Sequence, residues 1–460
     1  MSQCFAVKGI GGADQATLGS AEILVKYAQL ADKRARVYVL VSTWLVVWGI
    51  WHVYFVEAVF PNAILWLHYY AASYEFGFVR RGLGGELIRM LTGDHFFAGA
   101  YTVLWTSITV WLIALAVVVW LILSTGNRSE RRIMLALLVP VLPFAFSYAI
   151  YNPHPELFGM TALVAFSIFL TRAHTSRTRV ILSTLYGLTM AVLALIHEAI
   201  PLEFALGAVL AIIVLSKNAT GATRRICTAL AIGPGTVSVL LLAVVGRRDI
   251  ADQLCAHIPH GMVENPWAVA TTPQRVLDYI FGRVESHADY HDWVCEHVTP
   301  WFNLDWITSA KLVAVVGFRA LFGAFLLGLL FFVATTSMIR YVSAVPVRTF
   351  FAELRGNLAL PVLASALLVP LFITAVDWTR WWVMITLDVA IVYILYAIDR
   401  PEIEQPPSRR NVQVFVCVVL VLAVIPDRVR QQHRQMRHPA GPPEGGHGDV
   451  GQPPLTCLGR

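Results

Sequence analysis

Two adjacent arginines followed by a glycine-rich stretch are the residues best suited to bind a charged ligand. Arg80 and Arg81 precede Gly82, Gly84 and Gly85. Arginine carries a permanent charge on a planar fork that fits phosphate oxygens. Glycines at a helix start let backbone amides approach an anion closely. The segment therefore predicts a phosphate or pyrophosphate cradle at a membrane surface; the alternative is that both arginines contact lipid headgroups.

A carboxylate stands just before this pair. Glu75 lies in the same segment, upstream of Arg80. It has two open roles: a structural ion-pair partner of the arginines, or a general base beside an anionic leaving group. The residues alone do not choose between them.

The segment that ends at Glu156 combines a histidine and a glutamate with prolines. Pro153 and Pro155 interrupt a helix, and they hold His154 and Glu156 in a rigid turn. Both side chains are candidates for substrate binding.

A histidine and a glutamate also follow a long apolar run. His197 and Glu198 come after it, roughly 26 Å above the inner edge of a membrane. Ionisable residues at that depth, with Glu203 after Pro201, are functional candidates by default. The chain lacks a second histidine four residues on, so the zinc-protease pattern fails and no metal ligands are assigned.

Asp377 and Arg380 stand among tryptophans near the last apolar runs. They either pair with each other or bind a sugar, since indole rings stack on sugar faces and carboxylates accept hydroxyl protons. The tryptophans also suit an interfacial belt. Deeper in their helices, Arg319 and Asp388 are expected to form a buried ion pair.

The long hydrophilic segment 246–311 contains two cysteines and several histidines. Cys255 and Cys295 are expected outside the cell, where a disulfide can form, but the sequence leaves this bond open. The histidines favour a solvated outer domain, with metal binding as a minor alternative. They are His257, His260, His287, His291 and His297.

The amino-acid composition indicates what kind of secondary structure positions these residues. Hydrophobic residues make up 57% of the 460 residues and charged residues only 14%. A soluble surface cannot be built from so few charges, so most of the chain must be solvated by lipid. The net charge of +6 resides in short loops between apolar runs and predicts no nucleic-acid partner.

Apolar runs predict an all-α polytopic bundle of about eleven transmembrane helices, since lipid offers no partner for an open strand edge. The runs are Val37–Phe60, Tyr101–Ser124, Ile133–Ile150, Leu157–Leu170, Val180–Ile196, Phe204–Leu215, Ile226–Val245, Leu312–Ser337, Leu358–Val376, Trp381–Ile398 and Val412–Ile425.

Every second loop is basic, which places these loops and the amino terminus in the cytoplasm. The expected organisation is a cytoplasmic segment 1–36 and a transmembrane domain 37–426. Its long outer loops are 61–100 and 246–311. A disordered tail, 427–460, is rich in Pro and Gly.

Two of the runs are too short to cross a membrane unaided. Residues 157–170 and 204–215 span about 18–21 Å, against a hydrocarbon core of about 30 Å. Basic residues fix their inner ends. The connections 151–156 and 197–203 should therefore sink into a wet recess that opens outward.

The polar groups crowd toward one surface, whereas a secondary transporter tends to have matched halves around a midplane site. With Glu75 in the first long outer loop, this architecture over residues 37–426 resembles the GT-C superfamily of polytopic glycosyltransferases. The string from Gly77 to Leu83 is also similar to one found in uncharacterised bacterial membrane proteins. The paired acidic signature of many GT-C enzymes is absent.

The resemblance implies a polyprenyl-phosphate-linked sugar as donor at the outer leaflet. Arg80 and Arg81 would neutralise the departing phosphate. Glu75, or else Glu198, would take the proton of the acceptor hydroxyl. The remaining candidates, all assigned to substrate binding, are His154, Glu156, His197, Asp377 and Arg380.

The lipid carrier supplies the leaving group, so no cofactor is expected, and a need for a divalent metal stays open. Membrane lipid is the other expected partner. Arginine dominates the basic residues, as in GC-rich bacterial genomes, so the expected location is a bacterial inner membrane. Two alternatives remain: a transporter or flippase for a lipid-linked glycan, and a non-catalytic subunit of an envelope assembly.

Overall fold

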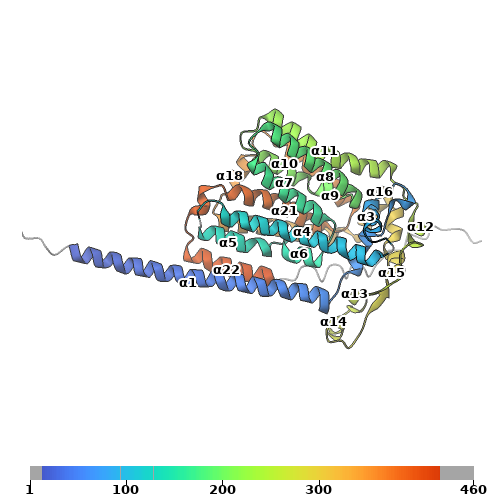
Figure 1. The fold of residues 1–460 in the computed structure, drawn as a ribbon, viewed down its shortest axis with the longest axis horizontal. Helices are drawn as coiled ribbons and strands as arrows, with labels where there is room; N and C mark the ends of the chain where they lie inside the picture. The colour runs from blue at the N-terminus through green and yellow to red at the C-terminus, as the bar shows by residue number, and fades with distance from the viewer. Residues whose placement is uncertain (1–12, 94, 128, 425–460) are drawn as a thin grey trace, which may run out of the picture.

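The structure is a computed structural model that describes residues 13–93, 95–127 and 129–424, with side chains from residue 33 onward. It is an all-α bundle of helices that run side by side, and segment 246–311, called the outer segment after its predicted location, gathers at one end (Figure 1). The predicted tail, 427–460, and the first twelve residues of segment 1–36 lie outside the described residues.

Helices before the outer segment form the first part of the bundle. They are α1 (Ala13–Tyr54), α2 (Ile64–Leu67), α3 (Gly82–Thr92), α4 (Phe96–Ser124), α5 (Glu130–Leu138), α6 (Phe146–Tyr151), α7 (Glu156–Arg172), α8 (Ser176–Ile196), α9 (Ile200–Glu203), α10 (Ala205–Leu215) and α11 (Gly221–Val245). Helices after it are α17 (Phe318–Ser343), α18 (Val347–Ala352), α19 (Ala359–Ala366), α20 (Val369–Thr374), α21 (Trp378–Ala397) and α22 (Arg409–Val424).

Seven helical stretches in the described chain are long and apolar enough to cross a membrane, fewer than the eleven predicted. They are Lys33–Val59, Phe96–Ser124, Glu130–Tyr151, Ser176–Ile196, Gly221–Val245, Phe318–Ser343 and Trp378–Ala397. The chain is therefore a multi-pass membrane protein, but three predicted runs form shorter helices, and the last run, Val412–Ile425, extends beyond the described residues.

Protein contacts explain why the shorter helices need not match the thickness of lipid. Every residue of α10 is buried, because α7, α11 and α21 pack around it. A helix enclosed by other helices makes its hydrogen bonds and apolar contacts within the protein. Its length therefore need not match the thickness of the hydrocarbon core. The run Leu358–Val376 divides into α19 and α20.

The basic loops predicted to face the cytoplasm meet at the end of the bundle opposite the outer segment. Arg34 of α1 pairs with Glu130 at the start of α5, at 3.0 Å. Arg132 pairs with Glu404, at 2.8 Å, in the loop before α22. These contacts agree with the predicted alternation of loops.

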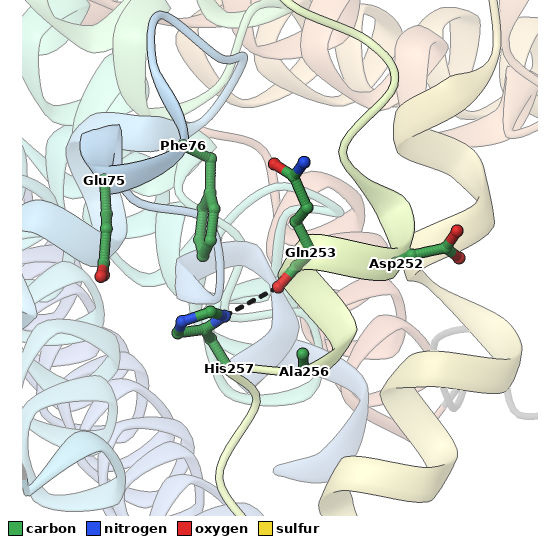
Figure 2. A pocket seen from close by; sticks show the side chains of 6 residues that line it. All are labelled: Glu75, Phe76, Asp252, Gln253, Ala256 and His257. Carbon is green, nitrogen blue, oxygen red and sulfur yellow. Dashed lines mark hydrogen bonds between the residues drawn. The ribbon is translucent and has the colours of Figure 1, made fainter.

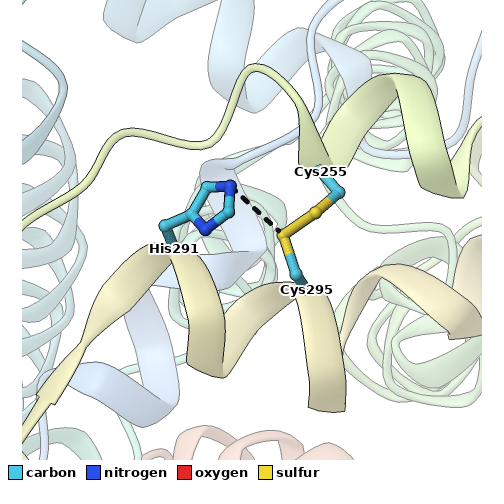
Figure 3. A group of neighbouring side chains, drawn as sticks. All are labelled: Cys255, His291 and Cys295. Carbon is cyan, nitrogen blue, oxygen red and sulfur yellow. Dashed lines mark hydrogen bonds between the residues drawn. A yellow bond between two sulfur atoms is a disulfide. The ribbon is translucent and has the colours of Figure 1, made fainter. Parts of the chain in front are cut away.

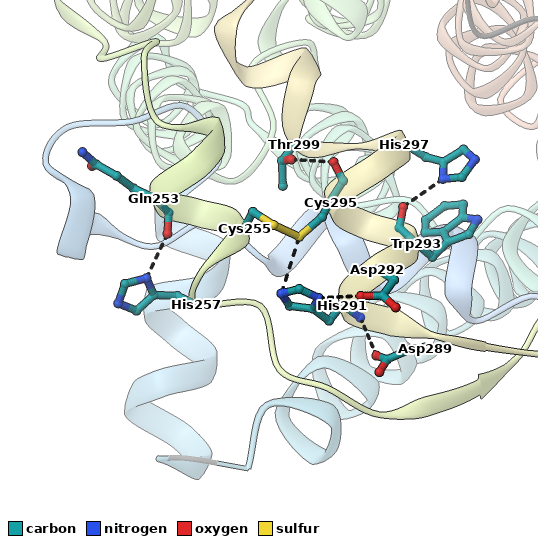
Figure 4. The surroundings of a disulfide bond; sticks show 10 residues. All are labelled: Gln253, Cys255, His257, Asp289, His291, Asp292, Trp293, Cys295, His297 and Thr299. Atoms are coloured by element: carbon teal, nitrogen blue, oxygen red, sulfur yellow. Dashed lines mark hydrogen bonds and ion pairs between the residues drawn. A yellow bond between two sulfur atoms is a disulfide. The ribbon is translucent and has the colours of Figure 1, made fainter. Parts of the chain in front are cut away.

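The outer segment folds into its own small elements. They are α12 (Ala251–Cys255), β1 (Met262–Glu264), α13 (Pro266–Val269), α14 (Pro273–Ile280), β2 (His287–Asp289), α15 (Tyr290–His297) and α16 (Trp306–Val316). Strands β1 and β2 pair antiparallel, with Val263 opposite Ala288. A disulfide joins Cys255 to Cys295, with the Cα atoms 5.2 Å apart, and so ties α12 to α15 (Figure 4). The bond that the sequence left open is therefore formed.

Candidate functional site

The arginine pair stands at the start of α3, where the chain turns sharply. Arg81 has a left-handed backbone (φ 62°), and the helix begins at the next residue, Gly82. Such a conformation in a residue other than glycine is costly and persists only where the surroundings hold it. A Cβ on Gly82 would come within 2.5 Å of the Tyr74 ring, so this turn needs glycine.

The other glycines of this segment serve packing rather than anion binding. A Cβ on Gly85 would lie 2.3 Å from the carbonyl oxygen of Ala72. The Gly85 amide donates to that same oxygen at 3.1 Å, so it does not point freely at a ligand. The predicted cradle of glycine amides is thus replaced by close contact between α3 and the preceding loop, and the arginines carry the positive charge of the segment.

Glu198 lies between the two guanidinium groups. The Nε atom of Arg81 donates to Oε2 of Glu198 at 3.2 Å, and its Nη2 atom donates to Oε1 at 3.3 Å. Nη1 of Arg80 lies 3.8 Å from the same carboxylate. The three side chains are 20–30% exposed, so water reaches them. We call Arg80, Arg81 and Glu198 the arginine cluster.

Charge governs the protonation of this cluster. Burial alone would raise the pKa of Glu198, but the charges of Arg81, His197 and Arg80 together hold that pKa below its usual range. Two cations facing one anion leave a net positive charge at the rim of the bundle. A carboxylate held in this way shows that the two guanidinium groups are placed to bind an oxyanion.

Aromatic rings connect the arginine cluster to the interior. The guanidinium of Arg81 lies over the Tyr69 ring, 5.1 Å from its centroid. That ring lies 5.4 Å from His197 and 5.1 Å from His154, measured between centroids. His154 in turn meets Trp66 edge-on at 4.4 Å. The result is a continuous row of rings from the rim to the turn before α7.

A second charged group surrounds Arg380, at the start of α21. Nη1 of Arg380 lies 3.2 Å from Nε2 of His154, within hydrogen-bond distance. Its Nε atom lies 3.6 Å from Asp377 and 3.8 Å from Glu156. The Arg380 side chain is only 10% exposed and also covers the Trp381 ring. Asp377 and Arg380 do pair, but within a larger group rather than alone.

Below Arg380 lie carboxyl groups that have no cation of their own. Glu156, Glu203 and Asp388 are fully buried. Tyr148 donates to Glu156 at 3.2 Å, and Glu203 faces Glu156. Within the described chain, neither Glu203 nor Asp388 forms an ion pair with Arg or Lys. An isolated buried carboxylate costs several kcal/mol, so burial favours the neutral form of Glu203 and raises its pKa above the usual value.

The predicted ion pair between Arg319 and Asp388 is wrong. Arg319 is exposed on α17, whereas Asp388 faces the opposite way, toward α10. A Cβ on Gly207 of α10 would come within 2.4 Å of the Asp388 carboxyl. Similar depth along two helices did not make the two side chains neighbours, because depth says nothing about which face each residue occupies.

The structure brings most of the predicted site residues into one connected group. Its members are Arg80, Arg81, His154, Glu156, His197, Glu198, Asp377 and Arg380. Glu75 is not among them. It is exposed and lines a separate open cavity of about 540 Å³ with Phe76, Asp252, Gln253, Ala256 and His257 (Figure 2). Within the described residues no ion pair joins Glu75 to either arginine.

Sequence reasoning missed two features of the site. Phe302 lies under Arg80 at 5.1 Å, and the carbonyl of Trp301 accepts a hydrogen bond from the same guanidinium, so the outer segment closes over the arginines. Tyr69 and Trp66 supply the row of rings. The concentration of aromatic residues in Trp66–Tyr70 was the available signal.

A groove of about 450 Å³ adjoins the group at Trp66 and Pro153. It lies between α4, the connection from α1 to α2, and strand β1. Rings of Trp66, Tyr101 and Trp105 line it together with apolar side chains, and Glu57, Asn62 and Glu264 add hydrogen-bonding groups. The groove therefore combines apolar and aromatic surface with a few polar groups, as ligand pockets commonly do.

Comparison with known proteins gives a family. The model of one protein family, described as uncharacterised membrane protein Rv1490, matches residues 38–423 of the chain. No solved structure matches the chain.

Proposed function

The chain belongs to the Rv1490 family of uncharacterised membrane proteins, and for this member we propose a membrane glycosyltransferase. It moves a sugar from a polyprenyl-phosphate carrier to an acceptor at the outer leaflet of a bacterial inner membrane. The observation that carries the proposal is the arginine cluster: two guanidinium groups on one partly exposed carboxylate, connected by a row of aromatic rings to a groove.

The arginine cluster supports the binding of a lipid-linked phosphate. Arg81 is held by Glu198 and by the Tyr69 ring, so its fork is fixed before a ligand arrives. Pre-positioned positive charge stabilises negative charge that develops during a reaction. A phosphate that enters would displace the Glu198 carboxylate from one arginine. The exchange frees a carboxylate next to the bound phosphate.

The groove supports the binding of the sugar and of the first part of the lipid. Trp66, Tyr101 and Trp105 offer ring faces for stacking, and Asn62 and Glu264 offer hydrogen-bond partners for hydroxyl groups. Trp66 contacts His154, which lies beside Tyr69 under Arg81. The two binding regions are therefore joined through shared side chains.

The proposed step is a substitution at the anomeric carbon. The oxygen of the acceptor hydroxyl forms a bond to that carbon, and the bond between the carbon and the carrier phosphate breaks. The electron pair leaves with the phosphate, where Arg80 and Arg81 face the new charge. Glu198, freed from Arg81, takes the hydroxyl proton. Glu198 replaces Glu75 as the favoured base because Glu75 lines a different cavity.

A transfer assay on the full chain tests the proposal. Purified protein in nanodiscs is incubated with radiolabelled polyprenyl-phosphate hexose or pentose and an envelope glycan extract. We expect label to appear in the glycan, and Arg81→Ala to reduce its rate roughly 100-fold, the usual effect of removing one donor that stabilises developing charge.

Arg89→Ala is the matched control, because Arg89 lies on α3, the helix that follows Arg81, is 61% exposed and, among the described residues, pairs only with Glu86. Transfer at the wild-type rate in Arg81→Ala would contradict the assignment of the arginine cluster. Absence of transfer with every donor and extract would contradict the glycosyltransferase proposal itself.

The buried carboxyl groups favour a second candidate, a transporter or flippase for a lipid-linked glycan. Glu203 and Asp388 are fully buried and have no basic partner in the described structure, as in proton-linked transporters. Proteoliposomes with a fluorescent lipid-linked glycan separate the two candidates. Movement of intact lipid between leaflets, without cleavage of the sugar–phosphate bond, would select the transporter.

A further inference from the structure

We propose that the outer segment carries a binding site for a divalent transition metal, with Zn²⁺ as the favoured ion, formed by His260, His291 and Asp292. His260 precedes β1, and the other two residues lie in the first turn of α15. One ligand atom from each of the three lies within 4.8 Å of the others. The proposal does not depend on the glycosyltransferase function.

The two imidazole rings are placed as neighbours by the fold. Their centroids are 4.0 Å apart, and the ring planes differ by 22°. The pairing of Met262 with Asp289 fixes the loop that holds His260 against the start of α15. One turn further along α15, Cys295 forms the disulfide to Cys255 (Figure 4). A rigid scaffold therefore supports the site.

Carboxylates orient the histidines as they do in known metal sites. Nδ1 of His260 lies 2.9 Å from Oδ2 of Asp289, which leaves Nε2 of His260 for a metal. Asp289 is itself fixed, because its Oδ1 accepts from the amides of Gly261 and His291 at 3.3 and 3.0 Å. A carboxylate on the far side of an imidazole sets its tautomer and orientation and raises its basicity toward a metal.

His291 and Asp292 already have nearly the spacing of two ligands on one ion. Nδ1 of His291 lies 2.9 Å from Oδ1 of Asp292. Zinc bonds of about 2.0–2.1 Å in a tetrahedron place neighbouring ligand atoms about 3.3 Å apart. The metal would replace the proton that these two atoms now share, and the exposed His260 ring, now stacked on His291, would turn its Nε2 atom toward the ion.

The other ring nitrogen of His291, Nε2, faces the disulfide rather than the proposed site. Nε2 of His291 faces Sγ of Cys295 at 3.8 Å (Figure 3). While the disulfide is intact, its sulfurs are not thiolates, and thiolate is the form that binds metal. The ion is therefore expected to bind Nδ1 of His291. Two imidazoles and a carboxylate favour Zn²⁺ over the hard cations Mg²⁺ and Ca²⁺.

The site is open to solvent. The side chains of His260 and Asp292 are 70% and 75% exposed, and that of His291 is 22% exposed. Three protein ligands leave the fourth position for water, as in zinc sites that are not closed. Metal can therefore exchange without unfolding of the segment.

Metal titration of the full chain, purified without a histidine tag and without reductant, tests the site. Zn²⁺ binding is measured by calorimetry, and Co²⁺ binding by visible absorption. We expect His260→Ala and Asp292→Asn each to weaken binding by about ten-fold or more. His260 is mostly exposed, so its variant keeps the fold and the test remains decisive.

His257→Ala is the matched control, because His257 lies in the same segment, bonds the carbonyl oxygen of Gln253 at 2.9 Å and is not one of the proposed ligands. It should bind like the wild type. Equal affinity in wild type and His260→Ala would overturn the proposal. Binding that appears only after a phosphine reduces the disulfide would also overturn it, since the ligands would then be Cys255, Cys295 and His291.

Discussion

At the rim of the bundle, two arginines face the single carboxylate of Glu198, whereas deeper inside one arginine, Arg380, serves several acidic groups. The rim side chains are 20–30% exposed, and the deeper carboxyls of Glu156 and Glu203 are fully buried. The rim therefore has surplus positive charge in contact with water. The interior has surplus carboxyl groups that only protons can neutralise.

Because of this difference in charge and exposure, we expect the two regions to have separate roles. Surplus cationic charge near water attracts an anion such as a lipid-linked phosphate. The buried carboxyl groups of Glu156 and Glu203 lie next to each other, and Glu156 lies close to Arg380, so these side chains connect helices α7, α9 and α21. The substitutions below test whether the two regions respond as differently as their charges imply.

Removal of Arg380 should have the largest effect on stability. Arg380→Ala leaves Glu156 and Asp377 without a cation in the interior, and breaking a buried pair from one side costs about 3–5 kcal/mol. Thermal unfolding in detergent, followed by size-exclusion chromatography, measures the loss. Arg89→Ala, at an exposed position, should stay within about 0.5 kcal/mol of the wild type. Equal melting of the two variants would show that Arg380 does not hold the interior region.

The same change from glutamate to glutamine should destabilise the protein more in the rim region than in the interior. Glu198→Gln leaves Arg81 without its counter-charge and should cost about 2 kcal/mol. Glu203→Gln replaces a neutral acid by a neutral amide of the same shape and should cost less than about 1 kcal/mol. Paired unfolding curves measure both. A larger loss in Glu203→Gln would mean that Glu203 is ionised, and the contrast between the regions would fail.

The pH dependence of unfolding is a second test of the role of the Glu198 charge. The charges of Arg81, His197 and Arg80 outweigh burial and hold the pKa of Glu198 below its unfolded value of about 4.3. A depressed pKa contributes stability that is present above the unfolded value and is lost as pH falls through the folded value. The advantage of wild type over Glu198→Gln should therefore be constant near neutrality and shrink below about pH 4.

Much of the architecture could be predicted because lipid imposes strong rules. Composition established an all-α membrane protein, and loop charge identified the loops that meet at one end. The count of spans was too high because hydrophobicity does not reveal whether lipid or protein surrounds a helix. The runs that form α7 and α10 are apolar, and α10 is enclosed by other helices.

The sequence predicted which residues belong to the site better than it predicted which of them contact one another. Ionisable residues in apolar surroundings are rare, so Arg81, His154, Glu198 and Arg380 were identifiable one by one, and the structure joins them. Glu75 was grouped with the arginines by nearness in sequence. The left-handed turn at Arg81 instead directs the arginines to Glu198, more than a hundred residues away.

Binding of polyprenyl phosphate, the lipid that remains after transfer, tests the central claim most directly. Its affinity for the full chain in detergent can be measured by native mass spectrometry for wild type, Arg81→Ala and Arg89→Ala. If the arginine cluster holds the phosphate, Arg81→Ala should weaken binding by about ten-fold, the loss of one charge-assisted hydrogen bond, and Arg89→Ala should not. Equal affinity in all three proteins would contradict the account.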